Sequence, residues 1–287
     1  MSRLNCPCCG STFIKKKFYK NEFQINKCLN CKTLFVENLP NSINLKHIYE
    51  SESYYGCLNT ASVDRIKREN KRRLNFIKKI KISGSILDIG TAKGLLLDCA
   101  KEIGYDTFGI EISEANAKLC ESKGHKVFCG TLDEFIDNNI FPKKFDIICC
   151  LDVIEHTENP QKFIYSIIGL MNSHSLLVLS TPNYSGLFSF VLGKNDPFMT
   201  PPEHLNFFSK KGLSILLAKY GLKNDKYINF GVLTNKEVET RMKKIPFIKT
   251  SPAFIEFLTI FLNSFFILLN KLRIGLEMEF YISQNKK

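Results

Sequence analysis

The stretch Ser85-Ile-Leu-Asp-Ile-Gly-Thr-Ala-Lys-Gly94 places a short apolar strand directly before a glycine-bearing turn and a helix. Gly90 and Gly94 allow the backbone to approach a ligand closely, because glycine adopts conformations that other residues avoid. Glu111 ends the next predicted strand, 23 positions after Asp88. A carboxylate in that position can hold both hydroxyls of a ribose. The layout predicts a pocket for an adenosine-type cofactor.

Asp88 narrows the choice of cofactor. A dinucleotide site favours G-x-G-x-x-G with a pyrophosphate at the helix N-terminus, whereas here Asp88 stands two residues before the first glycine. A buried carboxylate would repel a diphosphate. It suits a ligand that carries an ammonium group and a sulfonium, such as S-adenosylmethionine.

The turn resembles the first motif of the class I S-adenosylmethionine-dependent methyltransferases, which is roughly acidic-x-Gly-x-Gly-x-Gly. The resemblance implies cofactor contacts at Asp88, Gly90, Ala92, Gly94 and Glu111. Ala92 replaces the middle glycine of the motif, and we expect a slightly tighter pocket from this substitution. We also expect a cofactor contact at Leu132, just after the predicted strand 126–130.

A second segment, 144–160, is similar to the fourth strand of that family and the loop behind it. Its run from Ile147 to Leu151 is continuously apolar, as in a strand buried on both faces of a parallel sheet. In the family, the residue at Asp152 faces the cofactor. The alternative is that Asp152 and Glu155 only cap a helix beginning near Asn159.

Strand and helix signals alternate through residues 85–181, and this alternation predicts a parallel sheet with helices on both faces. The expected strands are 85–90, 107–113, 126–130, 145–153, 175–181, 223–231 and 275–283. We therefore predict an α/β fold, the Rossmann-like seven-stranded methyltransferase sheet. The expected division is a zinc-ribbon-like domain at 1–40, a helical linker or cofactor lid at 41–81, and a methyltransferase domain at 82–287 with a helical insertion at about 232–273.

The insertion contains a strongly apolar helix at 252–271, close to the ~20 residues that span a membrane. Glu256, Asn263 and Asn270 interrupt it, so we expect no transmembrane span. Three interpretations stay open: a helix packed on the domain itself, a homodimer interface, or a membrane-surface segment. The flanking basic residues keep the third open.

Two C-x-x-C pairs, Cys6 with Cys9 and Cys28 with Cys31, are separated by 18 residues near the N-terminus. Four thiolates presented by two tight turns suit tetrahedral Zn²⁺, and this spacing is typical of a four-cysteine site. Cys8 is an alternative ligand to Cys9. We predict a structural zinc ribbon.

The net charge of +12 could favour nucleic acid as a partner. However, the basic runs are short, and we expect Lys67, Arg68, Lys71 and Arg72 to lie on a solvated face opposite an apolar face that ends at Ile80. Cys99, Cys120, Cys129, Cys149 and Cys150 fall on predicted helices and buried strands, where cysteine behaves as a small apolar residue. Only Cys57 falls in a predicted loop. With no signal peptide expected, these cysteines predict a reduced, cytoplasmic setting.

Two histidines stand where the cleft is expected. His156 follows the fourth strand, and His204 lies in Pro201-Pro-Glu-His-Leu-Asn-Phe-Phe-Ser209. Either imidazole could act as a base near neutral pH, or could simply bind a loop. We expect His204 to be the base and His156 to hold the shape of its loop.

These segments together resemble the broad methyltransferase group encoded beside polysaccharide and secondary-metabolite genes. The resemblance implies methyl transfer to a small molecule such as a nucleotide-linked sugar. One alternative is an RNA methyltransferase that grips its substrate with the ribbon and the basic surface. Another is a non-catalytic protein of the same fold that mediates assembly.

Overall fold

The computed structural model describes residues 3–39, 60–138, 141–196, 198–231, 238–239, 251–272 and 275–284. Its main sheet has seven strands in the order β10-β11-β8-β7-β4-β5-β6. Those strands are β4 (Ser85–Ile89), β5 (Asp106–Glu111), β6 (Lys126–Cys129), β7 (Phe145–Leu151), β8 (Met171–Pro182), β10 (Leu222–Phe230) and β11 (Glu277–Gln284). The predicted seven-stranded α/β sheet is confirmed.

Six of these strands run in the same direction, and β11 alone of the seven runs opposite to them. Parallel pairing joins β6, β5, β4, β7 and β8, and β11 then pairs antiparallel with both β8 and β10. The carboxyl ends of the parallel strands therefore meet along one edge of the sheet, where α/β proteins place their ligands.

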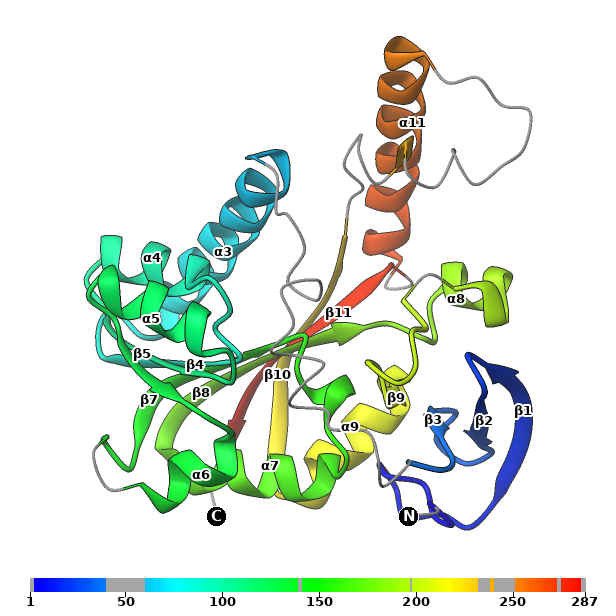
Figure 1. Cartoon of the computed structure of the whole chain (residues 1–287), viewed down its shortest axis with the longest axis horizontal. Helices are drawn as coiled ribbons and strands as arrows, with labels where there is room; N and C mark the ends of the chain where they lie inside the picture. The colour runs from blue at the N-terminus through cyan, green and yellow to red at the C-terminus, as the bar shows by residue number, and fades with distance from the viewer. Residues whose placement is uncertain are drawn as a thin grey trace.

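Helices cover both faces of the sheet (Figure 1). They are α3 (Thr60–Ile80), α4 (Leu95–Glu102), α5 (Glu114–Ser122), α6 (Leu132–Asp137), α7 (Pro160–Gly169), α8 (Leu187–Leu192), α9 (Lys210–Lys219) and α11 (Pro252–Lys271), with 3₁₀ turns η1 (Ile154–His156) and η2 (Gly193–Asn195). Alternate residues of β7 fill two cores: Ile148 and Cys150 join one, and Ile147 and Cys149 join the other.

The N-terminal ribbon is built from β1 (Ile14–Lys20), β2 (Phe23–Cys28) and β3 (Leu34–Val36), and a short strand of the main domain, β9 (Asn206–Phe207), completes its sheet. Gly212 on α9 lies against this ribbon, because a Cβ there would stand 2.0 Å from Thr33 Oγ1 and 3.3 Å from Cys31 Sγ. Ser209 Oγ also donates a hydrogen bond to the carbonyl of Cys31 at 2.5 Å. The ribbon is thus continuous with the larger domain.

Three expectations about single residues are wrong. Arg72 does not lie on a solvated face, since it is half-buried and pairs with Glu279 at 3.0 Å. Ile80 is 51% exposed and does not extend the apolar face of α3. Cys129 is exposed because β6 is the edge strand of the sheet. Cys57 and the rest of 41–59 in the linker lie outside the described residues, as do 232–237, 240–250 and 273 of the insertion.

Candidate active site

The turn between β4 and α4 has the backbone conformation that its glycines suggest. Gly90 and Gly94 have φ of 76° and 74°, and Ala92 has φ of 48°. A Cβ on Gly90 would lie 2.6 Å from Val153 Cγ2, and one on Gly94 would lie 2.8 Å from Cys120 Sγ. Both glycines are required by conformation and by space. Ala92 also lies in the left-handed region, where its Cβ makes the backbone less stable than glycine would be.

Asp88 is a buried carboxyl group at the carboxyl end of β4. It pairs with Gly109 of β5 on one side and Cys149 of β7 on the other, and it is 4% exposed. Burial raises its pKa to about 7, and the nearby carboxylate of Glu111 adds to the shift. A cation bound beside this group would favour its ionised form.

Glu111 is held by the backbone. Its Oε2 accepts a hydrogen bond from the N–H of Ala92 at 2.7 Å, and its Oε1 accepts one from the N–H of Ser113 at 2.8 Å. The side chain is only 1% exposed. Glu111 therefore joins the glycine turn to the end of β5. Each oxygen has a second lone pair that could accept a hydrogen bond from a ribose hydroxyl bound beside the turn. The contact with the ribose stays a proposal.

Asp152 lies at the end of β7 with an exposed side chain and a left-handed backbone, φ 55°. Its Oδ1 accepts a hydrogen bond from Ser180 Oγ at 2.9 Å, and its N–H donates to the carbonyl of Ser180 at 3.1 Å. The surrounding protein raises the pKa of Asp152 by desolvation. Asp152 does not cap the next helix, because the cap of α7 is the side chain of Asn159.

Glu155 is completely buried behind Asp152. Its Oε2 accepts a hydrogen bond from Thr181 Oγ1 at 3.0 Å, while its Oε1 has no hydrogen-bond partner among the described residues. Burial raises the pKa of Glu155 well above its ordinary value. Its carbonyl accepts from the N–H of Leu205 at 2.9 Å, which ties η1 to the loop that carries His204.

His156 and His204, remote in sequence, meet with their ring centroids 4.6 Å apart. His156 Nδ1 donates to the carbonyl of Glu203 at 2.8 Å, and His204 Nδ1 donates to the carbonyl of Phe198 at 2.6 Å. Burial lowers the pKa to about 4 for His156 and about 3 for His204. Since a carbonyl only accepts, Nδ1 carries a proton in both rings, and the lowered pKa of His204 leaves its Nε2 as an unprotonated acceptor at neutral pH.

These histidines and Glu155 form one cluster, whose potential ligand atoms all lie within 4.8 Å of one another. The cluster has the donor chemistry of a proton acceptor or of a divalent-metal site. Leu132 stands apart from it: this residue is 7% exposed and packs in the core below the β6–α6 turn. Its contact with a cofactor remains a prediction.

Sequence reasoning missed a buried charge group on β11 and α3. Glu279 pairs with Arg72 at 3.0 Å and with the buried Arg73, and although burial opposes ionisation, the two arginines hold the pKa of Glu279 below its ordinary value. Glu277 lies two residues earlier, beside the end of β8, and burial raises its pKa to about 8, with Asp152 adding to the shift. The signal was available in the alternation Glu277-Met-Glu279-Phe, which puts two acids on one face of a strand.

The four predicted cysteine ligands are brought together. The sulfurs of Cys6 and Cys31 are 3.5 Å apart, as are those of Cys9 and Cys28, and all four lie within 4.8 Å. Four thiolates at ~2.3 Å from a tetrahedral zinc stand ~3.8 Å apart, so the cluster is compatible with a zinc ribbon. Cys8 is buried and is not one of these four, although its thiol interacts with those of Cys6 and Cys31.

Comparison with known proteins decides the family. The family model described as "Methyltransferase domain" matches residues 63–227, more than half of the chain. The chain belongs to this methyltransferase family. Its fold is that of the class I S-adenosylmethionine-dependent methyltransferases.

Among curated relatives, the methyltransferase is similar to a ubiquinone biosynthesis O-methyltransferase of Rickettsia felis, 30% identical over 42% of this chain and 48% of that protein. A protein of the same name from Rickettsia typhi is 25% identical over 64% of this chain and 84% of its own. The first alignment thus spans about half the length of the relative.

Among solved structures, a SAM-dependent methyltransferase from Archaeoglobus fulgidus has a TM-score of 0.52 at 23% identity, covering 76% of this chain and 94% of its own. A plantazolicin methyltransferase, BpumL, solved with SAH and a substrate analogue, has a TM-score of 0.51 at 17% identity, covering 82% and 88%. These likenesses concern the fold.

Proposed function

We propose that the methyltransferase transfers a methyl group to a hydroxyl of a small-molecule acceptor. The observation that carries this proposal is the position of His204, whose ring meets His156 and the buried Glu155 beyond the carboxyl end of β7. The glycine turn follows β4, the strand that pairs with β7. The turn proposed to bind the cofactor and the His156–His204 pair therefore lie at the ends of neighbouring strands.

The chain's own residues would divide the work as follows. When bound, S-adenosylmethionine supplies a methyl group on a sulfonium, and the reaction is a direct displacement that needs alignment and removal of the acceptor's proton. Asp88 would face the charged end of the cofactor and Glu111 its ribose. His204 Nε2 would accept the hydroxyl proton, because Nδ1 is committed to the carbonyl of Phe198.

His156 has a different role in this proposal. Its Nδ1 binds the carbonyl of Glu203, the residue next to His204, so its imidazole fixes one loop against the other. Asp152 and Glu277 add carboxyl groups at the same edge of the sheet and would contact polar groups of cofactor or acceptor. His156 would thus position the base without taking the proton.

The acceptor class is the finer part of the proposal. The relatives named ubiquinone biosynthesis O-methyltransferases support a hydroxyl acceptor. A nucleotide-linked sugar, suggested by the sequence motifs, is a narrower version of the same chemistry. Turnover with a panel of hydroxylated aromatics and nucleotide sugars, followed by product mass, separates the two.

The test of the base is His204→Ala. We expect cofactor affinity to stay near that of the wild type and turnover to fall by ~10²-fold or more. His174→Ala, at an exposed histidine on β8, is the matched control and should change neither quantity. Near-normal turnover in His204→Ala would remove it as the base. A second metal ion per chain that His204→Ala loses, while the ion of the four cysteines stays, would instead assign the cluster to metal binding.

A further inference from the structure

Helix α11 leaves much of its apolar surface uncovered. Figure 1 shows it standing away from the sheet, in orange to red. One side packs on the protein through Ile255, Thr259, Phe266 and Leu269, which are buried. On the other sides, large apolar residues are 43–67% exposed: Phe254, Phe257, Ile260, Phe261, Phe265, Ile267, Leu268 and Leu272. Single exposed apolar residues are ordinary, but a patch of this extent marks an interaction surface.

Among the described helices, α11 alone is long and apolar enough to cross a membrane. Part of its surface nevertheless packs on the protein, because Val238 and Leu276, which precede and follow the helix in the chain, share one hydrophobic cluster with Ile255 and Phe266. The helix therefore offers a lateral apolar face.

Charge in the sequence around α11 is strongly one-sided. Between Glu239 and Glu277 the only acidic residue is Glu256, whereas six are basic: Arg241, Lys243, Lys244, Lys249, Lys271 and Arg273. An excess of positive charge of this kind attracts an anionic surface and opposes self-association.

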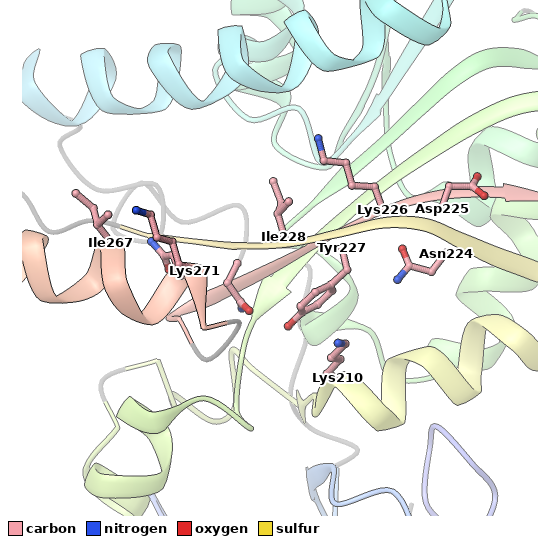
Figure 2. Close-up of a pocket in the computed structure, with 10 residues that line it drawn as sticks. Lys210, Asn224, Asp225, Lys226, Tyr227, Ile228, Ile267 and Lys271 are labelled. Atoms are coloured by element: carbon pink, nitrogen blue, oxygen red, sulfur yellow. The ribbon is translucent and has the colours of Figure 1, made fainter.

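A hollow between α11, β10 and α9 also carries an excess of positive charge. Figure 2 shows residues of α9, β10 and α11 around it, with Lys210 reaching toward Tyr227. The hollow has a volume of 790 Å³, and its charged lining residues are Lys210, Lys226 and Lys271 against Asp225. It lies along β10, the edge strand of the sheet, and is separate from the glycine turn.

We propose that α11 docks the methyltransferase on an anionic lipid membrane. The exposed apolar face of the helix enters the boundary between headgroups and acyl chains, as amphipathic interfacial helices do. Lys271 and the other lysines of the hollow, Lys210 and Lys226, face the anionic headgroups and add electrostatic attraction. The docking surface is independent of the proposed reaction.

The experiment is co-sedimentation of the full chain with vesicles of phosphatidylcholine alone or mixed with phosphatidylglycerol. We expect binding to the mixed vesicles that weakens as salt rises, because salt screens the basic residues. The double variant Phe257→Gln/Phe261→Gln should reduce the partition coefficient by ~100-fold, about tenfold for each phenylalanine removed from lipid. The matched control, Tyr19→Gln/Tyr165→Gln, changes two equally exposed aromatic residues elsewhere, 68% and 67% exposed, and should bind as the wild type does.

Calorimetric binding of S-adenosylhomocysteine shows whether each variant is folded. Failure of the folded wild type to bind mixed vesicles would overturn the proposal, and so would equal binding to both vesicle types. A dimer in light scattering that the double variant converts to a monomer would assign the helix to a second copy of the chain.

Discussion

Leu34 of the ribbon and Phe207 of the methyltransferase domain are paired in one antiparallel ladder. The next pair joins Phe35 to Asn206, whose side chain donates to the carbonyl of Thr157 at 2.7 Å. Leu205, one residue earlier, donates to the carbonyl of Glu155. The strand that completes the ribbon sheet therefore also holds the loop of His156 and His204. A displacement of the ribbon should therefore change the positions of these histidines more than the position of the glycine turn.

Replacing Cys28 by serine tests this coupling. We expect Cys28→Ser to lose the one metal ion predicted per chain, because serine does not replace a zinc thiolate. Turnover should fall together with the metal, while affinity for S-adenosylhomocysteine stays close to that of the wild type. Metal analysis, turnover and calorimetric titration measure the three quantities.

The matched control is Cys129→Ser, at an exposed cysteine on β6 of the main sheet. It should keep one metal per chain. Absence of metal from freshly purified, reduced wild type would contradict the ribbon assignment.

The two acids of β11 should respond differently to amide substitution. Glu279→Gln would leave the buried guanidinium of Arg73 without its carboxylate, and breaking a buried ion pair from one side costs about 3–5 kcal/mol. Glu277→Gln should cost much less at pH 7, because a carboxyl group with a pKa of about 8 is already mostly neutral. Urea unfolding of both variants gives the two free energies. Equal losses would show that the Arg73–Glu279 pair does not hold α3 to β11.

The affinity for the cationic cofactor should depend on pH through Asp88. Burial raises its pKa to about 7, so the carboxyl is largely neutral at pH 6 and ionised at pH 8. A sulfonium favours the ionised form. The ratio of S-adenosylmethionine affinity to S-adenosylhomocysteine affinity should therefore rise about tenfold between these values.

Asp88→Asn should abolish this pH dependence. Asp106→Asn, at the opposite end of neighbouring β5, should preserve it. If the ratio of S-adenosylmethionine affinity to S-adenosylhomocysteine affinity in the wild type did not change with pH, Asp88 would not interact with the sulfonium.

Local sequence patterns predicted much of the fold and part of the site. The glycine turn, the buried strand at β7 and the C-x-x-C pairs each lie within one short segment, where backbone conformation and spacing suffice. Pairings between remote segments were not predicted. The pairing of Phe207 with Leu34 of β3, the ion pair of Glu279 with Arg73 and the contact of His204 with His156 form only when complete elements pack together. The periodicity of a single segment does not predict such contacts. The binding of Glu111 to the N–H of Ala92 belongs to the same class, since it forms only once β4 and β5 lie side by side.

Calorimetric titration with S-adenosylhomocysteine of the wild type, Asp88→Ala, Glu111→Ala and the control Asp106→Ala tests the central claim most directly. The account predicts micromolar binding in the wild type and Asp106→Ala, and its loss in the other two variants. A folded wild type that does not bind, or Asp88→Ala and Glu111→Ala variants that bind as tightly as the wild type, would contradict the placement of the cofactor at the β4 turn.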